Sequence, residues 1–205
     1  MNAPSLDTTQ LVALAAALGW ASGLRLYAVV FITGLIGWVG WVQLPAGLQV
    51  LQHPLVLGAS GLMLGVEFFA DKIPGLDSLW DAVHTFIRIP AGMALAAGVF
   101  GGDSAVWATI AALAGGTLAA TSHAAKATTR AAVNTSPEPF SNVAMSLLGD
   151  AAVPTMLWLA LSHPVWFFVA LAIALVAMVT VTALLFRFLR ALLQSLRARI
   201  GAAGA

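Results

Sequence analysis

The longest apolar stretch of the chain, residues 11–42, reads LVALAAALGWASGLRLYAVVFITGLIGWVGWV and constrains the fold more than any other. As one straight helix it would extend about 48 Å, well beyond the ~30 Å hydrocarbon core of a bilayer. Arg25 would also lie near its middle, where a charged side chain is costly. A break at Trp20–Gly23 removes both difficulties. We therefore predict two shorter helices that meet near Arg25, either as a re-entrant hairpin or as one kinked span.

The composition indicates an integral membrane protein. Of the 205 residues, 60% are apolar and 8% are charged, whereas a soluble domain carries about 25% charged residues. All the apolar segments are predicted to be helices, because open strands cannot cross lipid. The expected fold is an all-α polytopic membrane protein, a single domain over residues 1–205 with about six membrane-embedded helical segments. After residues 11–42, these segments are residues 54–70, 85–101, 104–120, 140–161 and 164–186.

Composition also limits the partners and the chemistry. The chain has no cysteine, which excludes disulfides, thiolate metal sites and a catalytic thiol. Its net charge of +1 argues against a nucleic-acid partner. The expected partner is the lipid bilayer, and no cofactor is expected.

The basic residues predict an orientation in the membrane. The C-terminal stretch, residues 187–199, contains four arginines and should be cytoplasmic, because basic loops stay on that side. If the loops alternate between the two sides of the membrane, counting backward from this stretch puts all the remaining loop bases on the cytoplasmic side as well. We expect a multi-pass protein of the cell (inner) membrane with a cytoplasmic C-terminus.

Two similar segments predict an internal repeat. Apolar helices begin at His53–Pro54 and again at His163–Pro164, and a helix rich in small residues precedes each one. The first of these helices is predicted to break near Arg25 and the second near Lys126 and Arg130. We predict pseudo-repeats at about 11–70 and 104–187, linked by residues 71–101. Repeated broken helices that meet near a central site are a common transporter design.

The most polar segment, DKIPGLDSLWDAVHTFIRIP at residues 71–90, predicts an amphipathic helix. Its polar residues are spaced by four, three and four and so share one helix face. The simplest interpretation is a solvated helix along the cytoplasmic interface, ending before the chain re-enters at Pro90. The alternative is a stripe that faces inward and, with Glu67, binds a divalent metal or relays protons. The stripe consists of Asp77, Asp81, His84 and Arg88, of which the first three are the candidate metal ligands.

The basic residues within apolar segments predict an anion site. Arg25 could instead cap carbonyls at the helix break, and Lys126 and Arg130 could lie at the headgroups of a cytoplasmic loop. If the three converge, they would hold a phosphate or carboxylate. The candidate substrate-binding residues are Arg25, Tyr27, Lys126, Arg130, Asn134, Ser141 and Asn142. The acids expected to pair with these bases or carry coupling protons are Glu67, Asp71, Glu138 and Asp150, the last with a base from the other repeat.

Glycine motifs are interpreted as packing motifs. GASG at residues 58–61 matches the nucleophile motif of rhomboid proteases, but the chemistry would need a histidine to activate Ser60. No small-residue helix carries a histidine at matching depth, so we predict no enzyme. Gly19/Gly23 and Gly61/Gly65 are GxxxG pairs that could serve internal packing or a homodimer.

Three motifs carry a family resemblance: GWASGLRLY at 19–27, DKIPGLDSLWDAVHTFIRIPAG at 71–92 and NTSPEPFSN at 134–142. Together they resemble an uncharacterised bacterial family of integral membrane proteins that is defined as a domain of unknown function. The resemblance covers nearly the whole chain. It implies a small multi-pass protein of the cell membrane and implies no activity.

The residues themselves favour a small transporter or lipid-translocating protein. Its polar cavity between two broken helices would hold an anionic small molecule or a phospholipid. One alternative is a channel or carrier for protons or divalent cations that uses the acidic and histidine cluster. Another is a structural membrane subunit whose charges only hold helices together.

Overall fold

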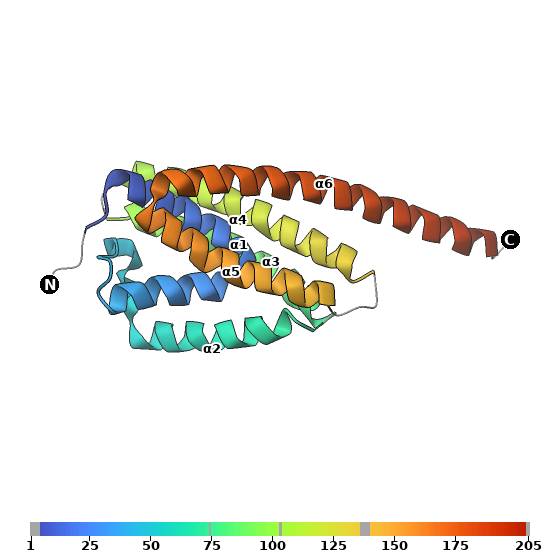
Figure 1. Cartoon of the computed structure of the whole chain (residues 1–205), viewed down its shortest axis with the longest axis horizontal. Coiled ribbons are helices and arrows are strands. Elements are labelled where there is room, and N and C mark those ends of the chain that lie inside the picture. The colour runs from blue at the N-terminus through green and yellow to red at the C-terminus, as the bar shows by residue number, and fades with distance from the viewer. Residues whose placement is uncertain (1–4, 74, 103, 136–139, 204–205) are drawn as a thin grey trace.

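The computed structural model describes residues 5–73, 75–102, 104–135 and 140–203, and these residues contain helices and no strand. In Figure 1 the helices pack side by side along one long axis, and the end of α6 extends beyond the bundle toward the C-terminus. The elements are α1 (Thr8–Trp38), the 3-10 helix η1 (Ala46–Gln52), α2 (Pro54–Ala70), α3 (Leu76–Phe100), α4 (Ala105–Val133), α5 (Phe140–Ser162) and α6 (Pro164–Ala203).

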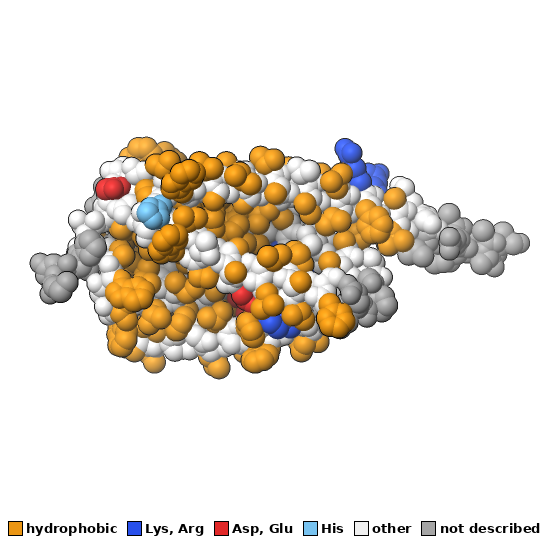
Figure 2. All heavy atoms as spheres, viewed as in Figure 1, with side chains coloured by type: hydrophobic (Ala, Val, Ile, Leu, Met, Phe, Trp, Pro, Cys, Tyr) orange, Lys and Arg blue, Asp and Glu red, His pale blue; other side chains and the backbone are white. Residues whose placement is uncertain are grey.

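The prediction of a polytopic helical membrane protein is confirmed. Among the described residues, five helices are long and apolar enough to cross a bilayer: α1, α3, α4, α5 and α6. A sixth crossing is possible if η1 and α2, which are bent by 70° at their junction, are counted together. Large apolar side chains cover much of the outer surface, as the face in Figure 2 shows. Such a surface requires lipid rather than water around it.

The predicted break in the first apolar run is confirmed, but it lies at Arg25, whose backbone is non-helical (φ −145°, ψ 76°), and not at Trp20–Gly23, which are helical. It divides α1 into a first arm, residues 8–24, and a second arm, residues 26–38. The first arm is the centre of the bundle, where Leu14 and Leu18 are fully buried. Its many alanines allow the surrounding helices to approach closely.

The two arms run in opposite directions. Val12, near the start of the first arm, shares a small pocket with Phe100 at the end of α3. Gly47 of η1, which follows the second arm, packs against Gly98, also at the end of α3. Both ends of α1 therefore lie at the same end of the bundle (Figure 1), and Arg25, at the bend, is buried inside it.

The second predicted break, near Lys126 and Arg130, is wrong. Helix α4 continues through both residues and ends at Val133. The prediction assumed that these charges need irregular backbone around them. Instead both bases reach carboxylates on neighbouring helices, so a regular helix can carry them. The pseudo-repeat remains a prediction.

The predicted interfacial helix is also wrong as a separate element. Residues 76–88 form the first half of α3, which continues through Pro90 to Phe100. The polar stripe faces inward, and Asp77, Asp81, His84 and Arg88 are each at most 4% exposed. Burial is tolerated because opposite charges on α2 and α4 lie against this stripe.

Glycines set the close packing of the central helices. Gly19, Gly92 and Gly115 come from α1, α3 and α4, and a Cβ atom added to Gly19 would collide with the Cα of Gly115. Gly23 likewise packs against α4, and Gly61 packs against the ring of Phe31. Internal packing therefore accounts for these positions but not for Gly58 or Gly65, where an added Cβ would meet no described atom within 4 Å. A homodimer remains a prediction.

Candidate functional site

A network of ion pairs lies inside the bundle, at the depth of the α1 break. Among the described residues it joins five basic and five acidic side chains, so its formal charge is zero. Because these chains come from five helices, the network ties most of the bundle together. The bases are Arg25, Lys72, Arg88, Lys126 and Arg130, and the acids are Glu67, Asp71, Asp77, Asp81 and Asp150.

Asp71, just after the end of α2, is the centre of the network. One of its carboxylate oxygens, Oδ2, accepts from Arg25, from Lys126 at 2.9 Å and from Arg130 at 3.1 Å. The side chain is fully buried. Its other oxygen, Oδ1, has no hydrogen-bond partner among the residues that the structure describes. Three predicted anion-binding bases thus converge on one carboxylate oxygen.

The break in α1 is stabilised by the same residues. The Lys126 Nζ donates to the carbonyl of Leu24 at 3.0 Å, and the hydroxyl of Ser122 donates to the carbonyl of Trp20 at 2.6 Å. These carbonyls precede the break, where helical hydrogen bonds are interrupted. Irregular backbone inside a membrane protein needs such internal partners. Two side chains of α4 therefore donate hydrogen bonds to carbonyls of α1 beside the break.

Arg25 reaches across to α5. Its guanidinium pairs with Asp150 at 2.8 Å and donates to the hydroxyl of Ser146, also at 2.8 Å. The sequence predicted a base from the other pseudo-repeat as the partner of Asp150, and this pair is present. Lys72 contacts the other oxygen of Asp150 at 3.2 Å.

The remaining part of the network lies between α2, α3 and α4. Arg88 is fully buried and pairs with Glu67 at 2.7 Å and with Asp81 at 2.6 Å. Lys126 also reaches Asp81, at 3.1 Å. Glu67 was expected to pair with the anion-binding bases, but Arg88 is its partner. The sequence placed Arg88 in the polar stripe without giving it a role, although its position seven residues after Asp81 puts both on one helix face.

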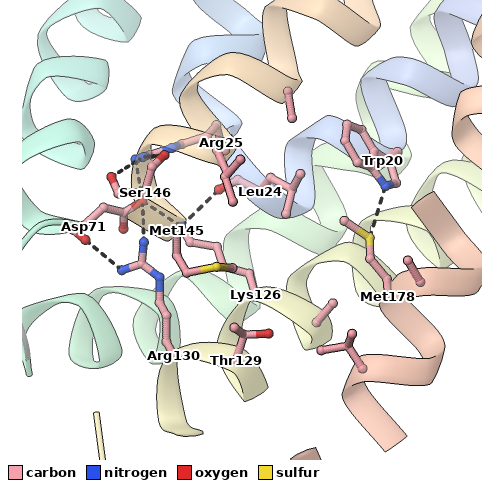
Figure 3. A pocket seen from close by; sticks show the side chains of 16 residues that line it. Trp20, Leu24, Arg25, Asp71, Lys126, Thr129, Arg130, Met145, Ser146 and Met178 are labelled. Atoms are coloured by element: carbon pink, nitrogen blue, oxygen red, sulfur yellow. Dashed lines mark hydrogen bonds and ion pairs between the residues drawn. The ribbon is translucent and has the colours of Figure 1, made fainter. Parts of the chain in front are cut away.

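A cavity of about 260 Å³ borders the network between α1, α4, α5 and α6. Figure 3 shows Arg25 and Arg130 reaching toward Asp71 at one end of the cavity, and Trp20 and Met178 at the other. Its charged lining residues are Arg25, Asp71, Lys126 and Arg130. Most of the other walls are apolar: Trp20, Leu24, Met145, Leu148, Ala152, Ala177, Met178 and Val181. The cavity therefore has a charged end and an apolar end.

The other predicted substrate-binding residues lie elsewhere. The hydroxyl of Tyr27 is 3.1 Å from Nε2 of His84, whose ring stacks on Trp80. Asn134 donates to Asp77 at 3.1 Å and accepts from Asn142 at 2.6 Å. Neither these residues nor Ser141 line the cavity. Glu138 lies outside the described residues.

The candidate metal ligands do not form a ligand group. Asp77 and Asp81 form ion pairs with Arg130, at 3.3 Å and 3.4 Å, and His84 lies against Tyr27 and Trp80. In the described part of the chain, no three His, Asp or Glu side chains are arranged to hold a metal ion. The carboxylates of the stripe are therefore ion-pair partners in this structure, because basic side chains occupy the space around them.

Two features of the site have no counterpart among the predicted residues. Ser146 binds both Arg25 and Lys72 from α5, at 2.8 Å and 3.1 Å. His123 lies 2.7 Å from the hydroxyl of Thr85, beside the buried Arg88. The sequence contains no signal for Ser146. His123 lies three residues before Lys126 and so shares a helix face with it, which was the available signal. Ser60 of the GASG motif donates to the carbonyl of Val56 at 2.7 Å, within its own helix.

Comparison with known proteins identifies the family and no activity. No curated protein and no solved structure is significantly similar to the chain. The sequence profile of one family matches residues 12–183, which includes all the residues of the ion-pair network. The chain therefore belongs to the family defined by a domain of unknown function, DUF4126.

Proposed function

We propose that this protein is a small membrane transporter or lipid-translocating protein that holds an anionic group at its central cavity. The observation that carries the proposal is the convergence of Arg25, Lys126 and Arg130 on one oxygen of Asp71 at the cavity wall. A carboxylate is itself an anion, so its position marks a point where three basic groups can bind negative charge. Asp71 is then an internal counter-ion that a substrate anion replaces.

The proposal includes an arrangement in the membrane. Helix α1 is a re-entrant hairpin that enters and leaves on the outer side, with Arg25 at its deepest point. The C-terminus is cytoplasmic, and the membrane is the cell membrane. The positions of both ends of α1 at one end of the bundle support this arrangement. Broken helices that bring polar groups to a buried site are a recurring feature of secondary transporters.

A structural membrane subunit is the second candidate. The equal number of bases and acids in the network supports it, because a neutral network holds helices together without any ligand. A carrier for divalent cations has less support, since basic groups already pair with Glu67, Asp77 and Asp81.

Reconstitution into proteoliposomes tests the proposal. We would measure uptake of radiolabelled phosphate and of small carboxylates, and movement of a fluorescent anionic phospholipid between leaflets. The double variant Asp81→Asn/Lys126→Gln removes one charge of each sign, from a pair 3.1 Å apart, so the network stays neutral and Asp71 keeps Arg25 and Arg130. Circular dichroism checks that the variant folds. Flux of the transported anion should fall at least about tenfold in this variant, because losing one strong charge-assisted contact costs ~1.5–3 kcal/mol.

Arg190→Gln is the matched control, because Arg190 is an exposed base on α6 outside the network. It should transport like the parent. A parent that moves none of these anions would favour the structural subunit. A parent that moves protons or divalent cations alone would favour the cation carrier. Unchanged anion flux in the double variant would place the anion site elsewhere.

A further inference from the structure

We infer that the cavity takes an amphipathic anion, in which one charged headgroup is joined to an alkyl or acyl chain. This inference rests on the proposed function and names its substrate class. Small hydrophilic anions are the competing class. The two classes differ in what the apolar end of the cavity contributes to binding.

The two ends of the cavity match the two parts of such a molecule. At one end, the guanidinium groups of Arg25 and Arg130 point toward Asp71, and the hydroxyl of Ser146 accepts from Arg25 at 2.8 Å (Figure 3). At the other end, the indole N–H of Trp20 donates to the sulfur of Met178, with 3.4 Å between nitrogen and sulfur. An anionic headgroup can replace the carboxylate at the first end, and an alkyl chain can occupy the second.

The cavity opens where lipid chains would lie. Its wall residues Met145, Leu148 and Val181 are 36%, 64% and 41% exposed, so the wall reaches the outer surface of α5 and α6. The two helices join at Ser162–Pro164. In Figure 2, the surface between them is hollowed and mainly hydrophobic. Val181 is 17 residues into α6 and therefore about 25 Å from that junction, within the ~30 Å depth of the hydrocarbon core.

This opening selects against small hydrated anions. A free phosphate that entered from lipid would have to lose its hydration shell before it reached the bases that could compensate for it. An amphipathic anion keeps its chain in the hydrocarbon region while its headgroup reaches the bases. The cavity, at about 260 Å³, is slightly smaller than the ~300–1,000 Å³ of common small-molecule sites. The rest of a long chain would extend out between α5 and α6.

Exchange of Asp71 for a headgroup also keeps a negative charge beside Arg25, Lys126 and Arg130. A monoanionic headgroup replaces one negative charge with another, so the bases stay neutralised. The Asp71 Oδ1, which is buried without a hydrogen-bond partner among the described residues, would gain partners if the side chain turned away. A buried carboxylate oxygen without a hydrogen-bond partner is destabilised, which favours the exchange.

Binding to the full-length protein in zwitterionic lipid nanodiscs tests the inference. The probes are radiolabelled decyl phosphate, inorganic phosphate and decanol, each corrected for uptake by empty nanodiscs. Decyl phosphate should bind saturably and at least about tenfold more tightly than either other probe, because only it engages both ends of the cavity. Ala152→Trp fills the apolar wall without changing a charge and should weaken decyl phosphate at least about tenfold. Ala151→Trp, on an exposed position of the same helix, is the matched control and should bind like the parent.

The outcomes separate the inference from the proposed function. Equal affinity for phosphate and decyl phosphate, unchanged by Ala152→Trp, would overturn the amphipathic substrate and leave an anion transporter in place. Decanol binding as tightly as decyl phosphate would also overturn the inference, since the bases would then contribute nothing. No saturable binding of either phosphate probe would overturn the inference, and no flux of any anion in the proteoliposomes would overturn the proposed function as well.

Discussion

Arg88 lies fully buried between Glu67 and Asp81, and its loss would leave Glu67 unpaired inside the bundle, whereas Asp81 would keep Lys126 and Arg130. In a buried ion pair the attraction roughly offsets the cost of removing both charges from water. Deleting one partner leaves that cost without the attraction. The single residues of the network should therefore be far more sensitive to substitution than exposed charges are.

We expect Arg88→Gln to lower the free energy of unfolding by about 3–5 kcal/mol, because a buried charge loses its partner. Adding Glu67→Gln to this variant should recover part of the loss. Titration of the protein from mild detergent into dodecyl sulfate, followed by circular dichroism, measures both changes. A loss below about 1 kcal/mol, the range of an exposed pair, would contradict the prediction.

Substitution of Asp71 should increase the affinity for decyl phosphate more than substitution of Asp150 does. Asp71→Asn removes the internal anion from three bases, so decyl phosphate should bind the variant at least about tenfold more tightly, equivalent to ~1.4 kcal/mol. Asp150→Asn removes the same charge from Arg25, but Asp150 does not line the cavity. The nanodisc assay should find a smaller gain for Asp150→Asn, and equal gains would argue against a special role for Asp71.

At the scale of helices, the crossing of α1, α3 and α4 depends on glycine rather than on charge. Gly19 and Gly115 bring two backbones into contact, and the added Cβ atoms have no space between them. Van der Waals packing between backbones is a main source of helix association in membranes. The crossing also places the end of the first arm of α1 beside Ser122 and Lys126, so it positions the site.

Gly19→Ala should therefore lower the free energy of unfolding by about 1–3 kcal/mol through overpacking. Gly58→Ala is the matched control, because a Cβ there meets no described atom within 4 Å. It should be neutral or raise stability by up to about 1 kcal/mol, the difference in helix propensity. The same dodecyl sulfate titration compares the two variants, and equal losses would show that the crossing tolerates a methyl group.

At the scale of the whole molecule, the path of α1 determines the topology. The absence of native cysteine makes single-cysteine variants straightforward to interpret. Thr9, Gln43, Ser162 and Gln194 are exposed positions suited to labelling. A hairpin puts the first three on one side of the membrane, whereas a single span would put Thr9 and Gln43 on opposite sides.

We expect cysteines at Thr9, Gln43 and Ser162 to react with a membrane-impermeant maleimide added to intact cells, after removal of the outer barrier. A cysteine at Gln194 should react only after the membrane is opened, because basic segments remain cytoplasmic. Gel shifts of the labelled protein report each reaction. Protection of position 9 together with labelling of position 43 would exclude the hairpin.

Much of the fold could be predicted because its causes are local. The length and apolarity of each segment predict the membrane helices, and Arg25 within an overlong run predicts the break. The interfacial helix and the break in α4 were wrong for one shared reason. Both predictions treated charged residues as needing water or irregular backbone, whereas carboxylates and bases on neighbouring helices neutralise them.

The chain's sequence by itself determined that this is a helical membrane protein with a charged residue at a break in its first helix. Both follow from hydrophobicity and from helix length, which need no knowledge of neighbours. Only the tertiary structure decided that Arg25, Lys126 and Arg130 meet at Asp71, and that Arg88 forms ion pairs with Glu67 and Asp81. Residue spacing shows which side chains share a helix face, but the energy of a buried charge depends on what lies opposite it.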